Sequence, residues 1–458
     1  MKSSDSKYSI CFLQKGFREK RFTPMDVTQH ALKEARAHSQ IFTQVCEKEA
    51  LLQANESTQR WRHGTPASEL DGIPFAVKDL FDIKGYATTR GSTLYSALSD
   101  STSPQVLALI ESGAVLIGKT NLSEFAYSGL GLNPHFGTPT QTYNDNAYIT
   151  GGSSCGSAAA VLENIVPFTL GTDTAGSIRI PSSYCGLVGF RASRKRYDNR
   201  GIAPLSPSLD TTGPIGHCVD DILLVDSVLY SPTEQPAGSS HSGLVFDAQF
   251  CQQLPLDCDT RRAFDLSLDA LQNAGVAVED VRLSTLDATL DLIKNIGWLG
   301  SIEAYLTYEN LVNTDKLGQV DPLVAQRLAA SNQLPATQIS YLYQQREKLQ
   351  QRLSNELAGR AFLMPTTLTT APLLSQVTQS VESFNEHNIN ALRLTMIGSY
   401  LDCPGIALPN GYNSNGLPTS LLLSQCSGND DALISLAKTI EPAIASLLIK
   451  QSKGNNHG

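Results

Sequence analysis

The chain has 458 residues, of which 41% are apolar and 17% are charged. This composition is ordinary for a globular protein, and the length is sufficient to bury a large core. The formal net charge is −9, and an acidic balance argues against nucleic acid as the main partner.

The N-terminal stretch is charged and mixed and lacks the apolar run of a secretory signal. No apolar run is long enough to cross a bilayer. The nine cysteines are scattered and include no C-x-x-C pair, which indicates reduced thiols rather than a disulfide framework or a zinc site. The eight histidines form no metal-binding motif. We therefore expect a cytoplasmic protein without a metal or a cofactor and without membrane attachment.

The first expected element is an amphipathic helix that begins at Thr23 and Pro24, since threonine suits an N-cap and proline suits the first helical position. Apolar residues then recur at helical spacing, at Val27, Ala31, Leu32 and Ala35. A second helical stretch is predicted from Gln44 to Arg62.

The texture of the chain changes near residue 70. The apolar run from Gly72 to Lys78 predicts a buried strand with the lysine at its end. A helix is expected over Pro104–Ser112 and a strand over Ala114–Ile117. A long stretch rich in Gly, Ser, Thr and Asn follows, Ser128–Thr174, broken by the apolar segment Ala158–Leu170. Such a loop-rich centre is typical of a functional region.

The second half of the chain predicts alternating helices and strands, which favours an α/β layered fold. The expected helices are Arg261–Ala274, Val324–Arg360 and Asp430–Leu448, and the expected strands are Val276–Val281, Phe362–Met364 and Gly405–Leu408. Two further segments are interpreted as surface loops: Ser231–Ser242, and the short basic cluster Arg191–Arg200, which is expected to be solvated.

Residues Gly113–Thr120 match the P-loop pattern of nucleotide-binding proteins letter for letter. A P-loop needs a strand before its first glycine and free backbone amides in the loop that follows. Here a helix is expected before Gly113, and the residues between the two glycines are themselves an apolar strand. The sequence therefore disfavours nucleotide binding.

Residues Gly152–Gly156 match the G-x-S-x-G nucleophile elbow. That elbow requires an apolar strand that runs directly into the serine. The preceding residues, Asn144–Thr150, are polar and turn-like, which disfavours an α/β-hydrolase triad. Cys155 has no obvious histidine partner, and we interpret it as a small packed residue rather than a catalytic thiol.

Three segments combine residue types that suit acyl transfer. They are Lys78 after its apolar run, Gly151–Ser157 with Ser153, and Gly171–Arg179 with Ser177. Glycine allows backbone amides to approach a ligand closely. A serine surrounded by such amides is placed where a tetrahedral oxyanion can be held. Each segment alone is equally compatible with a tight turn.

These segments, in this order, resemble the amidase signature family. The matching pieces are GGSS from Gly151, GTDTAGSIRIP from Gly171, CGLVG from Cys185, GKTNLSEF from Gly118, PLSPSLDTTG from Pro204, MPT from Met364 and GLP from Gly416. The resemblance covers nearly the whole chain. It implies one α/β domain over residues 1–458, a mixed β-sheet covered by helices on both faces. Within it, residues 1–65 would form an N-terminal helical segment and residues 66–220 the catalytic core.

The resemblance also implies a Ser-cisSer-Lys triad, with Ser177 as the nucleophile, Ser153 as the bridging serine and Lys78 as the base. Such a role requires a neutral lysine, whose ordinary pKa is about 10.4. Burial favours the neutral form and lowers such a pKa by up to about 3–5 units. A neutral Lys78 could accept a proton from Ser177 through Ser153.

The oxyanion hole is expected at the backbone N–H groups of Thr174, Ala175, Gly176 and Ser177. Asp173 and Arg179 flank the nucleophile and are interpreted as a structural ion pair that holds the loop. By resemblance, the substrate pocket is bounded by residues 127–132 and 392–400. Its candidate lining residues are Tyr127, Ser128, Gly129, Leu130, Leu132, Met396 and Tyr400, with core packing an equally good interpretation of each.

The leading hypothesis is an amidase that hydrolyses a linear, non-peptide carboxamide of a small molecule, with homodimerisation left open. A second is the A subunit of a glutamyl-tRNA amidotransferase, which delivers ammonia to a partner subunit. Those subunits usually have glutamine where this chain has Ile180. A third is a catalytically inert scaffold, which the intact triad residues oppose. Three features depart from the family pattern: Cys155, Phe190–Ser193 and the atypical Arg194–Arg200.

Overall fold

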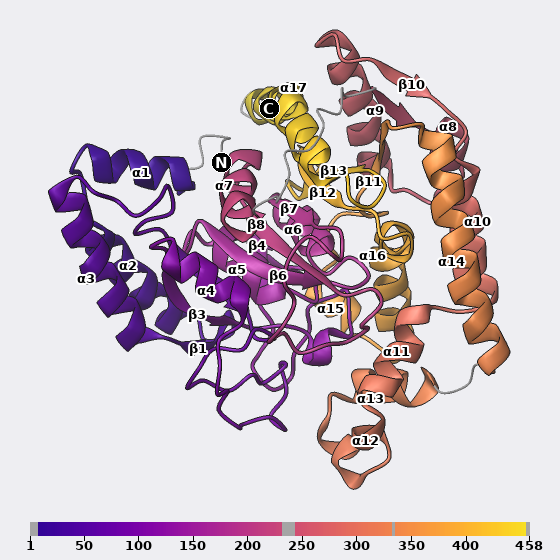
Figure 1. The fold of residues 1–458 in the computed structure, drawn as a ribbon. Helices are drawn as coiled ribbons and strands as arrows, with labels where there is room; N and C mark the ends of the chain where they lie inside the picture. The colour runs from indigo at the N-terminus through magenta and orange to yellow at the C-terminus, as the bar shows by residue number, and fades with distance from the viewer. Residues whose placement is uncertain (1–7, 231–242, 332–334, 455–458) are drawn as a thin grey trace.

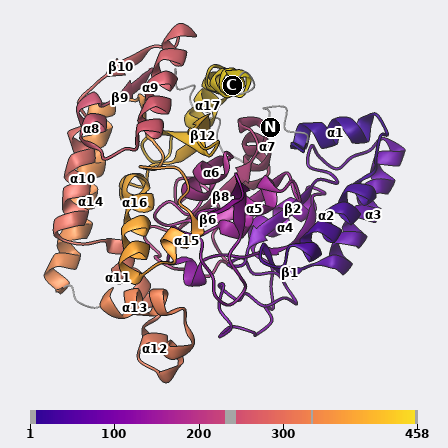
Figure 2. The ribbon, with the colours of Figure 1, turned by 180° about the vertical axis from the view of Figure 1, so that it is seen from behind.

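A computed structural model describes residues 8–230, 243–331 and 335–454. The predicted loop Ser231–Ser242 lies outside the described residues. The described chain is built around one sheet. The N-terminal helices lie at one end of the molecule, and the long helix α14 (Ala336–Leu357) lies at the other (Figures 1 and 2).

The strands of the main sheet are β1 Phe42–Val45, β2 Pro74–Lys78, β3 Val115–Thr120, β6 Phe168–Asp173, β7 Val188–Arg191, β8 Thr211–Gly216, β9 Leu244–Phe246, β10 Val278–Asp280, β11 Ala361–Pro365, β12 Gly405–Tyr412 and β13 Pro418–Ser424. They lie in the order β1-β3-β2-β6-β8-β7-β12-β13-β11-β9-β10. The strand β2 is parallel to β3 and β6, and β9 is parallel to β10 and β11, whereas the remaining pairs are antiparallel. A separate hairpin joins β4 (Thr140–Tyr143) to β5 (Asn146–Ile149).

The helices are α1 Ile10–Arg18, α2 Pro24–Ala37, α3 Glu47–His63, α4 Pro104–Glu111, α5 Cys155–Leu162, α6 Arg179–Cys185, α7 Val219–Leu229, α8 Ala248–Gln253, α9 Cys258–Asn273, α10 Ser284–Asn295, α11 Leu299–Thr307, α12 Glu309–Val312, α13 Pro322–Ala330, α14 Ala336–Leu357, α15 Leu374–Val377, α16 Val381–Tyr400 and α17 Asp430–Gly454. Short 3-10 turns lie at Glu124–Ala126 and Asp315–Gln319. Within the described ranges, no helix has the length and apolar character needed to span a bilayer.

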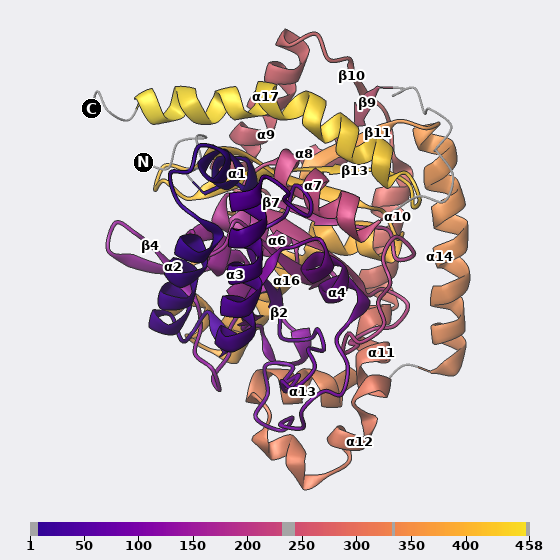
Figure 3. The same ribbon diagram turned by 60° about the vertical axis from the view of Figure 1, so that its left-hand side comes forward.

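The alternation of side chains along β2 shows that helices cover both faces of the sheet. Phe75 and Val77 pack with residues of α1, α4 and α7 on one face. Ala76 packs with residues of α2, α3 and α5 on the other, because successive strand residues point to opposite faces. In Figure 3, α17 crosses over the molecule above the N-terminal helices. The predicted α/β fold, a mixed sheet covered by helices on both faces, is confirmed.

Several predicted elements have different bounds. The helix predicted from Gln44 begins only at Glu47, since Phe42–Val45 pairs with β3 as an edge strand. The apolar segment 158–170 contains the end of helix α5 and the start of strand β6. The helix predicted over 324–360 is two helices, α13 and α14, and the second begins after Pro335, whose missing N–H suits a helix start.

The interpretation of Arg191–Arg200 as a solvated loop holds for only part of the segment, in which Lys195 and Arg200 are exposed. Arg191 is fully buried, and its guanidinium lies 3.4 Å from the Asp402 carboxylate. Arg196 is also buried and forms a 2.6 Å ion pair with Asp226. Two of the five basic residues of this segment are therefore neutralised within the fold.

Candidate active site

The candidate residues meet at the carboxyl edge of two neighbouring parallel strands. Lys78 is the last residue of β2, and Asp173 is the last residue of β6. These strands pair in parallel register, with Ala76 opposite Thr169. Because parallel strands end at the same edge of a sheet, Lys78 lies next to the loop that follows β6 and carries Ser177.

Lys78 is completely buried and linked to two hydroxyl groups. Hydrogen bonds join its Nζ to Ser153 Oγ at 2.7 Å and to Thr172 Oγ1 at 2.8 Å. Burial lowers the pKa of Lys78 to about 7. Nζ makes no other hydrogen bond with the described residues. In the neutral amine, which has two N–H bonds and one lone pair, the lone pair can face Ser153 Oγ and accept its proton while one N–H donates to Thr172 Oγ1.

Backbone hydrogen bonds fix the loop that carries Ser153 from both sides. The peptide bond between Gly152 and Ser153 is cis. The Gly152 N–H donates to the Gly129 carbonyl at 2.8 Å, and the Ser153 carbonyl accepts from the Ser123 N–H at 3.2 Å. The next N–H, that of Ser154, donates to the Ser177 carbonyl at 3.3 Å. The loops that carry the two serines are therefore in direct contact.

A buried carboxylate holds the turn around Ser177. Asp173 accepts two hydrogen bonds from the Arg179 guanidinium, at 3.0 and 2.8 Å, and a third from the Ile178 N–H at 3.1 Å. The predicted ion pair of Asp173 and Arg179 is confirmed. The guanidinium of Arg191, 3.7 Å away, also faces Asp173 and was not found from the sequence, because it follows 18 positions later on another strand.

The four N–H groups of residues 174–177 make no hydrogen bond to any acceptor in the described part of the chain. The other groups of this loop are anchored. Thr174 Oγ1 donates to Asp210 at 2.6 Å, and the Ala175 carbonyl accepts from Thr395 Oγ1 at 2.6 Å. Gly176 has φ of +141°, a conformation that residues with a side chain rarely adopt. The loop is thus held rigidly with its N–H groups left available.

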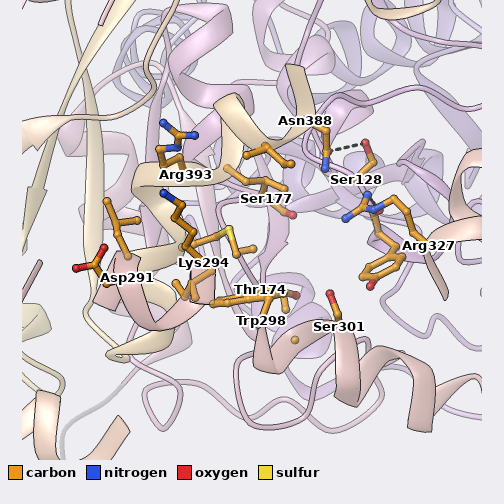
Figure 4. A pocket seen from close by; sticks show the side chains of 18 of the residues that line it. Ser128, Thr174, Ser177, Asp291, Lys294, Trp298, Ser301, Arg327, Asn388 and Arg393 are labelled. Atoms are coloured by element: carbon orange, nitrogen blue, oxygen red, sulfur yellow. Dashed lines mark hydrogen bonds between the residues drawn. The ribbon is translucent and has the colours of Figure 1, made fainter. Parts of the chain in front are cut away.

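A cavity of about 620 Å³ opens next to this loop. Ser177, Thr174 and Ala175 form part of its wall (Figure 4). Of the residues predicted to line a substrate pocket, Tyr127, Ser128 and Met396 do so, whereas Leu132 is not part of this wall.

Three other residues predicted to line the pocket are not among those that line this cavity. Tyr400 is fully buried in a hydrophobic core, and its hydroxyl donates to the Leu342 carbonyl, so its prediction as a lining residue is wrong. Leu130 is likewise buried among apolar side chains. Gly129 contributes only backbone: its N–H donates to Asn388 Oδ1 at 2.8 Å.

Much of the cavity wall comes from helices α10, α13 and α16 and from the segments around α11, which carry no recognisable motif. Polar and aromatic residues on this wall include Lys294, Trp298, Arg327, Asn388 and Arg393. Only proximity in the fold brings them to Ser177.

The two misleading motifs have structural roles. Lys119 of the P-loop-like segment is fully buried and forms a 2.7 Å ion pair with Asp79, so it is not available to a phosphate. Ser154, at the centre of the G-x-S-x-G match, is also buried and donates to the Thr172 carbonyl at 3.3 Å. Part of the segment read as turn-like before it is strand β5 of a small hairpin. Cys155 is fully buried and packed, and no two of the nine cysteines, all of which lie in the described ranges, form a disulfide.

Comparison with known proteins identifies the class. The sequence pattern of the amidase family matches residues 26–434. A crystal structure of an amidase is 29% identical in sequence and superposes with a TM-score of 0.84, covering 95% of this chain and 100% of that chain. The fold and the family match together define an enzyme that acts on C–N amide bonds. The chain belongs to the amidase signature family.

Curated relatives span more than one activity. Mandelamide hydrolase of Pseudomonas putida is 29% identical over 93% of this chain and 89% of its own length. The 2-amino-5-chloromuconic acid deaminase of Comamonas testosteroni is 30% identical over 83% of each chain. The A subunit of the mitochondrial glutamyl-tRNA(Gln) amidotransferase of Aedes aegypti is 28% identical over 94% of this chain and 96% of its own length.

Proposed function

We propose that this enzyme is a serine amidase that hydrolyses a carboxamide of a small molecule through an acyl-enzyme on Ser177. Lys78 acts as the base through Ser153, and the backbone N–H groups of residues 174–177 form the oxyanion hole. The observation that carries the proposal is the fully buried Lys78, whose pKa is lowered to about 7 and whose Nζ lies 2.7 Å from Ser153 Oγ.

In the first half of the cycle, Ser177 Oγ attacks the carbonyl carbon of the substrate. Its proton passes to Ser153 Oγ while the Ser153 proton passes to the neutral amine of Lys78. The free N–H groups of the loop stabilise the oxyanion that forms. The C–N bond then breaks, the proton returns along the same path to the leaving nitrogen, and ammonia or an amine departs.

In the second half of the cycle, water replaces the amine. Its proton follows the same relay to Lys78, and the hydroxyl attacks the acyl-enzyme carbonyl. Collapse of the second tetrahedral intermediate breaks the bond to Ser177 Oγ, which recovers its proton, and the carboxylic acid leaves. The relay therefore needs Lys78 to be neutral at the start of each half, which a pKa near 7 permits at neutral pH.

A fluorophosphonate probe tests the nucleophile without knowledge of the substrate. We expect labelling of one serine, located at Ser177 by peptide mass spectrometry, and loss of labelling in Ser177→Ala. Ser154→Ala is the matched control, because Ser154 is in the adjacent loop but donates to the Thr172 carbonyl. Labelling that persists in Ser177→Ala would overturn the assignment. A protein inert both to the probe and to a panel of amides would instead be a scaffold.

The second candidate is the A subunit of an amidotransferase, because one such protein is 28% identical over nearly the whole chain. The presence of Ile180 directly after Ser-Ile-Arg counts against it. Arg191 and Arg196 are buried in ion pairs and are not available to the phosphates of a tRNA. Release of ammonia from glutamine only in the presence of partner proteins encoded by adjacent genes would favour this second function.

A further inference from the structure

A guanidinium group lies on the wall of the same cavity as Ser177. Arg327, on helix α13, is partly buried there (Figure 4). Its Nη1 donates to the Tyr127 carbonyl at 2.6 Å, and the guanidinium lies 4.5 Å from the centre of the Tyr127 ring. Both contacts are to uncharged groups, and they fix the position of the guanidinium at the edge of the cavity.

Arg327 has no carboxylate partner among the residues that the structure describes. Burial lowers its pKa, opposed only by Tyr127, yet an arginine keeps its charge at neutral pH. A cation removed from water without an anion is unfavourable. Arg179 and Arg196, which are more deeply buried, each pair with an aspartate. An anionic ligand in the cavity is therefore the expected counter-ion of Arg327.

A second donor lies on the same side of the cavity. Asn388 is buried, and its Oδ1 accepts from the Gly129 N–H at 2.8 Å and from Ser128 Oγ at 3.2 Å. This arrangement leaves the Asn388 Nδ2 group as a donor without an acceptor in the described chain. In Figure 4, Ser128, Asn388 and Arg327 lie to one side of Ser177, and Lys294 and Arg393 lie to the other.

We propose that Arg327 and Asn388 form an anion subsite, and that the substrate is a small amide that also carries a carboxylate. This inference rests on the amidase function proposed above. The free Nε and Nη2 of the guanidinium form a fork that matches the two oxygens of a carboxylate. The subsite orients the substrate so that its amide carbonyl, and not the carboxylate, reaches Ser177. The carboxylate could belong to the acyl part or to the amine part of the substrate, because the guanidinium would bind it in the same way in either case.

A labelling competition tests the subsite without relying on turnover. The initial rate of fluorophosphonate labelling at Ser177 is measured in the presence of paired competitors: succinate and terephthalate, with butanamide and benzamide as uncharged counterparts. We expect the anions to slow labelling at concentrations about ten- to a hundredfold lower than their uncharged counterparts, as suits hydrogen bonds to a charged group. Arg327→Met should remove this difference, and Arg327→Lys, which keeps the charge but loses the fork, should retain part of it.

Arg393→Met is the matched control, because it removes a cation from the opposite side of the same cavity. It should preserve the preference for anions. A preference that survives in Arg327→Met, or falls equally in Arg393→Met, would overturn the inference, as would the absence of any preference in the wild-type protein. These outcomes leave labelling of Ser177 intact, whereas a wild-type protein that is not labelled at all contradicts the proposed amidase and with it the subsite.

Hydrolysis of paired amides then locates the carboxylate. Succinamate against butanamide tests the acyl side, and N-acetylglycine against N-ethylacetamide tests the amine side. In one of the two pairs, kcat/KM should be about ten- to a hundredfold higher for the compound with the carboxylate. This difference should lie chiefly in KM and should depend on Arg327, and the pair that shows it identifies the side. Uncharged amides that are cleaved as efficiently as the anions in both pairs would contradict the proposal.

Discussion

Replacing Gly176 with alanine tests whether the loop of residues 174–177 must keep its backbone in place. The added Cβ would lie 2.2 Å from Thr395 Oγ1 and 2.8 Å from Ile180 Cδ1. Thr395 cannot yield easily, because it is fully buried and its Oγ1 donates to the Ala175 carbonyl at 2.6 Å. The loop itself must therefore shift, and with it the N–H groups proposed to bind the oxyanion.

The expected loss of activity in Gly176→Ala is large. Displacement of one oxyanion donor typically lowers a rate by about 10²–10³, whereas overpacking lowers stability by only about 1–3 kcal/mol. Two measurements separate these effects: the initial rate of fluorophosphonate labelling at Ser177 and the thermal unfolding curve. The rate should fall by about two orders of magnitude at a temperature where the variant is still folded.

Gly275→Ala is the control for backbone strain. Gly275 also has a positive φ, +77°, but no atom lies within 4 Å of the added Cβ. Gly275→Ala places alanine near the left-handed region, at a cost of about 1–2 kcal/mol, and thus reports the effect of an alanine at positive φ without a clash. Only Gly176→Ala moves the loop. The reasoning fails if Gly176→Ala keeps more than about a tenth of the wild-type labelling rate, since loss of one donor alone predicts a larger effect.

Two further substitutions test the groups that support the site. Asp173→Asn leaves the guanidinium groups of Arg179 and Arg191 without their shared carboxylate and should destabilise the fold by about 3–5 kcal/mol. A fall of several degrees in Tm would show this effect, whereas an unchanged Tm would show that the pair contributes little. Thr172→Val removes the hydroxyl that accepts a hydrogen bond from Lys78 Nζ. That hydrogen bond stabilises the charged amine more than the neutral one, so its loss lowers the pKa of Lys78. The pH at which labelling of Ser177 is half-maximal should therefore fall below the wild-type value, and a rise would be the wrong sign.

The local motifs around the proposed catalytic residues could be found from the sequence, because glycine and serine are concentrated in short segments there. The strand that ends at Lys78, the glycines around Ser153 and the Asp173–Arg179 pair all lie within short segments. Some of their hydrogen bonds join residues close in sequence, as for Asp173 and Arg179. Others join neighbouring strands and loops, as for Lys78 and Ser153. The structure brings Lys78 to Ser153 and pairs Asp173 with Arg179, and the catalytic roles of these segments belong to the proposal above.

The cavity wall could not be predicted in the same way. Arg327 and Asn388 lie on helices α13 and α16, more than a hundred residues after Ser177, and only tertiary packing brings them together. Helix α16 itself was not predicted. The burial of Arg191 and Arg196 was missed for a related reason, because Asp402 lies 211 positions after Arg191 and Asp226 lies 30 positions after Arg196.

The most direct test of the mechanism is the pH dependence of the rate at which the fluorophosphonate probe labels Ser177. With a neutral Lys78 as the base, the rate should be half-maximal near pH 7 and should fall about tenfold for each pH unit below about pH 6. In Lys78→Ala, labelling should be strongly reduced at every pH and should lack this acidic limb. A wild-type rate that does not change between about pH 5 and pH 9, or an acidic limb that persists in Lys78→Ala, would contradict the proposed relay from Ser177 through Ser153 to Lys78.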